Sequence, residues 1–93
     1  MATVMHKATI NLEDVSDLNF ILCPEGSEIL SAAEQYPGQI AIWFRCDGSK
    51  PLRKRAISIA GTGHHVPKDA KFIGTIMFSN NRLVLHLFDR GYM

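Results

Sequence analysis

Residues 39–46 read Gln-Ile-Ala-Ile-Trp-Phe-Arg-Cys, and this stretch decides the fold class. Ile40, Ile42 and Phe44 fall on one face of an extended chain, because side chains alternate along a strand. β-Branched and aromatic residues of this kind favour strands. The stretch therefore predicts a strand, and we interpret Trp43 and Phe44 as core residues.

Short runs of the same kind occur along the rest of the chain, separated by turn residues such as Asn80-Asn81. Residues 28–36 contain good helix formers, but Pro37-Gly38 follows at once and is typical of a tight turn. We favour a strand over a helix there. The other predicted strands cover residues 5–12, 18–23, 55–60, 72–78 and 83–88. The pattern predicts an all-β fold, a compact antiparallel sandwich or small barrel of five to seven strands.

The composition indicates one globular domain over residues 1–93, with 46% hydrophobic and 20% charged residues. A net charge of +1 argues against a general nucleic-acid binder, which needs a strongly basic face. We see no signal-peptide or membrane-spanning stretch, and we interpret Cys23 and Cys46 as reduced, buried thiols. These features predict a cytoplasmic protein without membrane contact.

Two of the predicted strands are apolar on both faces. In residues 83–88, three leucines alternate with Val84, His86 and Phe88, and residues 72–78 show a similar pattern. An antiparallel sheet with one solvated face should alternate apolar and polar residues instead. Either the sheet closes on itself or a second subunit covers it, and we expect a homo-oligomer.

The segment Gly61-Thr62-Gly63-His64 is the best candidate for a ligand site. Glycines allow positive φ, so that successive N–H groups can converge on an anion. Thr62 offers a hydroxyl and His64 a charge that depends on protonation, which suits a phosphate or a ribose. The alternative is a turn in which glycine is required by geometry alone. No Lys-Ser/Thr pair completes a P-loop.

A basic stretch precedes this segment, with Lys50, Arg53, Lys54 and Arg55 within six positions. It is either a solvated hairpin end or a patch for an anionic ligand or an acidic partner. Arg53 and Arg55 share the parity of the residues that lead to Gly61 on the same predicted strand. We therefore expect one of these arginines to supply charge to the site, from the same or a neighbouring subunit.

Catalytic, metal and cofactor sites are not predicted. His64 and His65 are adjacent, so in an extended chain they point to opposite sides and rarely share a metal ion. His6 and His86 have no carboxylate or thiol at a familiar ligand spacing. Since no acid–base pair is visible either, we expect a protein that is not an enzyme and carries no cofactor.

The chain resembles a family of small uncharacterised proteins encoded mainly by phages and prophages. The resemblance rests on Ile59-Ala60-Gly61-Thr62-Gly63-His64, Val66-Pro67, Phe72-Ile73-Gly74-Thr75 and residues 83–88. An upstream segment, Pro24-x-Gly26 followed by Ile29-Leu30-Ser31, also matches. It implies a viral accessory protein with a compact β-fold and imports no catalytic residue. The doubled His64-His65 and the basic run at residues 53–55 depart from the family pattern.

These features together predict a non-enzymatic, phage-type accessory protein that forms a homo-oligomer and binds a small phosphate-bearing ligand, such as a host nucleotide signal. Gly61, Thr62, Gly63 and His64 would line the site, and Arg53 or Arg55 would add charge. The alternative is a protein-interaction module that inhibits or redirects a host enzyme, or a minor virion component.

Overall fold

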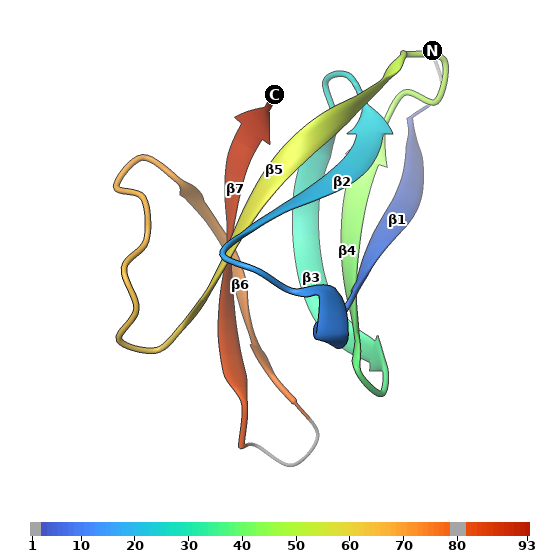
Figure 1. Ribbon diagram of the computed structural model, residues 1–93. Coiled ribbons are helices and arrows are strands. Elements are labelled where there is room, and N and C mark those ends of the chain that lie inside the picture. The colour runs from blue at the N-terminus through green and yellow to red at the C-terminus, as the bar shows by residue number, and fades with distance from the viewer. Residues whose placement is uncertain (1–2, 79–81) are drawn as a thin grey trace.

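The computed structural model describes residues 3–78 and 82–93, and it shows two stacked β-sheets (Figure 1). The strands of the described part are β1 (Val4–Asn11), β2 (Leu18–Pro24), β3 (Glu28–Tyr36), β4 (Gln39–Cys46), β5 (Leu52–Gly61), β6 (Lys71–Met77) and β7 (Val84–Tyr92). One sheet has the order β1-β4-β3 and the other β2-β5-β7-β6, with all pairs antiparallel. A 3₁₀ helix, η1 (Leu12–Asp14), lies between β1 and β2. The predicted all-β fold is confirmed as a sandwich of seven strands.

The ambiguous residues 28–36 form strand β3, which pairs with β4 along its length. The turn between the two strands places Gly38 at φ +76°, a conformation that glycine adopts without a steric penalty. The Glu34 carboxylate accepts a hydrogen bond from the Gly38 amide at 2.9 Å and so holds the turn. The hairpin, rather than the helix, is therefore the correct interpretation.

The core lies between the two sheets and consists mainly of isoleucine and leucine. Its buried members are Ile10, Ile21, Ile40, Ile42, Ile57, Ile59, Ile76, Phe78, Leu85 and Leu87. A smaller buried cluster joins Cys23 and Cys46 to Phe44. Both cysteines are free thiols, as predicted, and burial raises the pKa of Cys46. Phe44 is a core residue, whereas the expectation for Trp43 is wrong, since its side chain is half-buried.

The two strands that are apolar on both faces, β6 and β7, cover part of their second face within the same chain. Leu85 and Leu87 of β7 point into the core, whereas Phe88 lies on the outer face of the four-stranded sheet. There Phe88 packs edge-to-face against Phe72 of β6, with ring centroids 5.5 Å apart. Phe72 nevertheless remains exposed. The second apolar face is thus only partly covered by the chain itself.

Two strand boundaries differ from the sequence prediction by three residues or more, and several others differ by one. Strand β5 begins at Leu52 rather than Arg55, and β7 continues to Tyr92 rather than ending at Phe88. The predicted hairpin turn at Asn80-Asn81 lies outside the described residues. In the described part of the chain, no helix is long and apolar enough to cross a membrane.

Candidate functional site

The glycine-histidine segment forms a tight turn directly after β5. The His64 amide donates a hydrogen bond to the Gly61 carbonyl at 3.1 Å, which closes the turn. Gly63 has a φ of +89°, which disfavours any residue with a side chain. A Cβ at Gly61 would lie 3.2 Å from Cε1 of the His64 ring. Both glycines therefore have a structural role. Gly63 allows the backbone geometry of the turn, and Gly61 leaves room for the His64 ring to pack against it.

The hydroxyl of Thr62 is engaged by a neighbouring strand. Thr62 Oγ1 lies 2.8 Å from Nε2 of His86 on β7, and Thr75 Oγ1 of β6 lies 2.9 Å from Nδ1 of the same ring. Both ring nitrogens of His86 thus have hydroxyl partners. This bridge fixes the start of the loop after β5 to the outer face of the four-stranded sheet.

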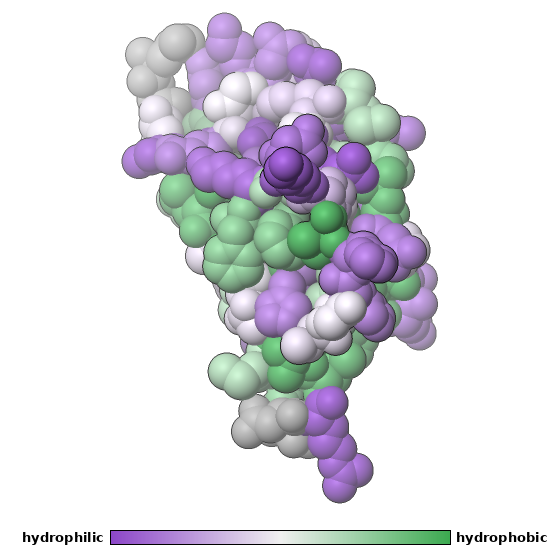
Figure 2. All heavy atoms as spheres, turned by 90° about the vertical axis from the view of Figure 1, so that its left-hand side faces the viewer, coloured by the Kyte–Doolittle hydropathy of each residue, from purple (hydrophilic) through white to green (hydrophobic). Residues whose placement is uncertain are grey.

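A hollow of about 470 Å³ opens beside this loop. Ser58 and Ala60 of β5 line it, and Leu18 at the start of β2 lies on one side. The loop residues that border it are His64, His65, Val66 and Pro67. Small side chains on β5, next to larger ones from the loop and β2, explain why the surface is hollowed here. Figure 2 faces the loop side of the molecule, where apolar groups gather across the middle between hydrophilic ones.

Two charged residues of opposite sign complete the lining. Asp17 precedes β2, and Arg90 lies near the end of β7. Arg90 is exposed, and its side chain has no hydrogen bond or ion pair to another residue in the described ranges. Sequence reasoning missed Arg90 because it ended the last strand at Phe88. Gly91 follows Arg90 and has a φ of +84°. A glycine at this position was the sequence signal that could have indicated an irregular strand end.

The structure separates the two halves of the site predicted from the sequence. Gly61, Thr62, Gly63 and His64 are together at the end of β5, with His64 at the hollow. Arg53 and Arg55 lie near the start of the same strand. Gly61 lies six positions after Arg55 along an extended chain, a span of roughly 20 Å. Within one subunit, neither arginine reaches the turn.

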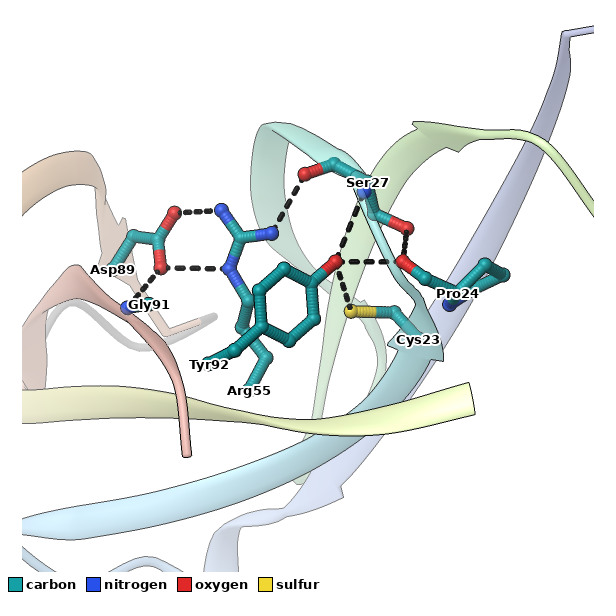
Figure 3. A network of polar contacts seen from close by, with 7 residues as sticks. All are labelled: Cys23, Pro24, Ser27, Arg55, Asp89, Gly91 and Tyr92. Carbon is teal, nitrogen blue, oxygen red and sulfur yellow. Dashed lines mark hydrogen bonds and ion pairs between the residues drawn. The ribbon is translucent and has the colours of Figure 1, made fainter. Parts of the chain in front are cut away.

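Arg55 belongs instead to an internal polar network (Figure 3). Its guanidinium forms a two-point ion pair with Asp89, in which Nε donates to Oδ1 at 2.9 Å. Nη1 donates to the Ser27 carbonyl at 2.6 Å. The Arg55 and Asp89 side chains are only 12% and 10% exposed. A group so fully paired and buried is poorly available to a ligand.

Tyr92 connects this network to the neighbouring sheet edge. Its hydroxyl donates to the Pro24 carbonyl at 2.6 Å and accepts from the Ser27 amide at 2.9 Å. The guanidinium groups of Arg53 and Arg55 lie 4.8 and 4.6 Å from the centre of the Tyr92 ring. Such cation–π contacts hold both guanidinium groups against the ring. Arg53 therefore also contributes to the packing of the C-terminal strand.

The electrostatics of the network agree with this structural role. Hydrogen bonding to Asp89 raises the pKa of Arg55. Burial alone raises the pKa of Asp89, but hydrogen bonds from Arg55 and from the Gly91 amide outweigh it and leave that pKa below its usual value. Among the described residues, no group of three or more His, Cys, Asp or Glu gathers as a metal site.

Residues 1–92 match a family described as a domain of unknown function (DUF7352). Searches of the curated proteins and of the solved structures find no match. The family match confirms that the chain is one of an uncharacterised group. The phage origin implied by the sequence resemblance stays a prediction.

Proposed function

The chain belongs to the DUF7352 family, and we propose that it is a non-enzymatic protein that binds a small phosphate-bearing ligand, a nucleotide signal, in the hollow beside β5. The proposal includes the phage or prophage setting and a place in the host cytoplasm, where such a protein would sequester the ligand. The observation that carries it is an arginine without a partner, Arg90, at the edge of a hollow lined by two histidines.

The size and the chemistry of the hollow support a nucleotide. Small-ligand pockets usually measure about 300–1,000 Å³, so a volume of about 470 Å³ is suitable. Arg90 offers charge-assisted and often bidentate hydrogen bonds to a phosphate. His64 and His65 add ring N–H donors on the loop side. These three side chains form the phosphate end of the proposed site.

The other lining residues are suited to the sugar and the base of a nucleotide. Asp17 would repel a phosphate, but its carboxylate accepts hydrogen bonds from sugar hydroxyls. Leu18, Val66 and Pro67 present apolar surface suited to a base. A ligand with an anionic end, hydroxyls and an apolar ring fits this set better than inorganic phosphate does.

The glycine turn has a positioning role in this proposal. It seats His64 against Gly61, and the Thr62–His86 bridge holds the loop on the sheet. Arg90 replaces Arg53 and Arg55 as the source of charge within one subunit, since those two stack on the Tyr92 ring. Charge from Arg53 or Arg55 of a neighbouring subunit stays a prediction.

Calorimetric titration against cyclic nucleotides, linear nucleotides and inorganic phosphate tests the proposal. Wild type should bind at least one nucleotide more tightly than phosphate. Arg90→Ala should weaken binding about tenfold or more, because a hydrogen bond to a charged group contributes roughly 1.5–3 kcal/mol. His64→Ala should weaken it as well. Arg45→Ala, at an exposed arginine on β4, is the matched control and should bind like wild type.

Two results would refute the proposal. Wild type that binds no member of the panel leaves it without support. If Arg90→Ala and His64→Ala both bind as tightly as wild type, the ligand occupies another site.

A protein-interaction module is the second candidate function. It is favoured by exposed apolar side chains on the outer face of the four-stranded sheet, among them Phe20 and Leu22 of β2 and Phe72 of β6. Exposed apolar side chains at the edges of a sheet are candidates for contact with another protein. Tight binding of a nucleotide that Arg90→Ala weakens would favour the first function over this one.

A further inference from the structure

Strand β2 is an unusual edge strand. The four edge strands of the sandwich are β1, β3, β2 and β6. Three of them carry the features that discourage pairing with other chains: β1 contains Lys7, β3 has two register shifts, and β6 has one. Strand β2 reads Leu-Asn-Phe-Ile-Leu-Cys-Pro and pairs with β5 without a register shift. It is a regular edge without a charged residue.

The free main-chain groups of β2 follow from its register with β5. The Ile59 amide donates to the Asp17 carbonyl at 3.2 Å, so position 17 points its hydrogen-bonding groups at β5. Because these groups alternate along an antiparallel strand, the even positions point theirs away from β5. The Leu18 carbonyl already accepts from Ser16 Oγ, and Pro24 has no N–H. Phe20 and Leu22 therefore present the unpaired groups of this edge.

The same two residues expose apolar side chains. Phe20 is 46% exposed and Leu22 is 59% exposed on the outer face of the sheet. A groove of about 380 Å³ runs between β1 and β2, with Thr9 and Asn11 on one side and Leu18 and Phe20 on the other. This side of the sandwich is therefore open beside β2, and the edge is accessible.

We propose that β2 pairs antiparallel with β2 of a second copy of this chain. A two-fold axis beside Ile21 would place Phe20 opposite Leu22 of the partner subunit, and Leu22 opposite Phe20 of the partner subunit. Each facing pair would exchange two main-chain hydrogen bonds, and apolar side chains would meet apolar side chains. Such an interface is self-complementary, as a two-fold dimer requires. The two four-stranded sheets would then form one continuous sheet.

A second copy fits this edge better than a charged peptide does. The residues that face the new strand are uncharged and apolar, so the edge matches its own sequence. Because the pairing uses a single strand from each subunit, we expect an interface of the class below about 1,200 Å², where complexes are weak or transient. We therefore expect a dimer that dissociates in the micromolar range. It would leave both hollows on one face of the joined sheet, with Leu18 of each near the interface.

Sedimentation velocity over a concentration series tests the pairing. Wild type should shift from the 10.4 kDa monomer to twice that mass as concentration rises. Leu22→Pro should abolish the shift, because it removes an edge-facing N–H and leaves the ladder with β5 intact. Phe20→Glu should abolish it as well, by placing a charge in the apolar interface. Phe72→Glu, on the opposite edge strand, is the matched control and should dimerise like wild type.

Hydrogen exchange provides a readout that needs no variant. The amides of Phe20 and Leu22 should exchange quickly at low concentration and become protected in the dimer. A monomer at every concentration overturns the proposal. So does a dimer in which these two amides still exchange quickly, or one that Phe72→Glu disrupts while Phe20→Glu and Leu22→Pro do not. Circular dichroism of each variant establishes that the β-fold is retained.

Discussion

Replacement of Arg55 by methionine should destabilise the fold severely. The substitution leaves Asp89, 10% exposed, without its ion-pair partner, and leaves the Ser27 carbonyl without the 2.6 Å hydrogen bond. Removal of one member of a buried ion pair costs about 3–5 kcal/mol. Domains of this size are stable by about 5–15 kcal/mol, so the loss amounts to about a fifth of the total or more. The variant should fold marginally or not at all at physiological temperature.

Urea denaturation followed by circular dichroism measures this effect. With a urea dependence of about 2 kcal/mol per molar, the midpoint should fall by roughly 2 M. The double variant Arg55→Met/Asp89→Leu should recover part of the loss, because it removes the unpaired charge as well. Arg45→Met is the control, since the ion pair of Arg45 with Glu28 is exposed and its loss should cost at most about 1 kcal/mol.

The assignment of Arg55 to the folded core would be refuted by a loss below about 1 kcal/mol in Arg55→Met. A double variant no better than the sum of the singles would refute the coupling between Arg55 and Asp89. In either case Arg55 would again be available as a source of charge for a ligand.

Three other perturbations test the turn, the acid sensitivity and the Tyr92 hydroxyl. Gly63→Ala should cost about 1–2 kcal/mol and lower the melting temperature by about 4–8 °C or more, because φ is +89° there; Gly61→Ala should cost less. The pKa of Asp89 is lowered on folding, so the ionised carboxylate stabilises the folded state. This stabilisation is complete above the unfolded pKa of about 4 and is lost as the pH falls through the lower folded pKa. Asp89→Asn should therefore make the unfolding free energy less dependent on acid pH in urea titrations. Tyr92→Phe should cost about 1–2 kcal/mol by the same assay, since the Ser27 amide loses its 2.9 Å partner, and an unchanged midpoint would contradict the contact.

The sequence was sufficient for the fold class because the strands carry their pattern locally. Alternation in residues 39–46 and the turn at Pro37-Gly38 each depend on a few neighbouring residues, and β4 and its hairpin with β3 form where they are expected. The order of strands in the two sheets depends on contacts between distant residues. No local pattern specifies these contacts, so the sequence left sandwich and barrel open.

The candidate site was only partly predictable for the same reason. The turn from Gly61 to His64 is local, and the sequence identified it. The Arg55–Asp89 ion pair joins residues 34 positions apart, so parity along β5 could not show that Arg55 is already paired. Arg90 was missed because the period-two pattern of β7 breaks after Phe88. In a single sequence, a bulge that interrupts the alternation of apolar and polar residues cannot be distinguished from the end of a strand.

That break also connects the internal network to the proposed site. Opposite Ala56 and Ile57, strand β7 contains one extra residue, Arg90, between the partners Asp89 and Gly91. In a regular strand, residues three apart face opposite sides, so Asp89 and Tyr92 could not both point inward. The bulge allows both to reach Arg55, and the Gly91 amide stabilises it by donating to Asp89 at 2.9 Å. The same extra residue places the Arg90 guanidinium at the hollow on the outer face. The bulge in β7 thus allows Arg55 to be paired inside the fold and leaves Arg90 available for a ligand.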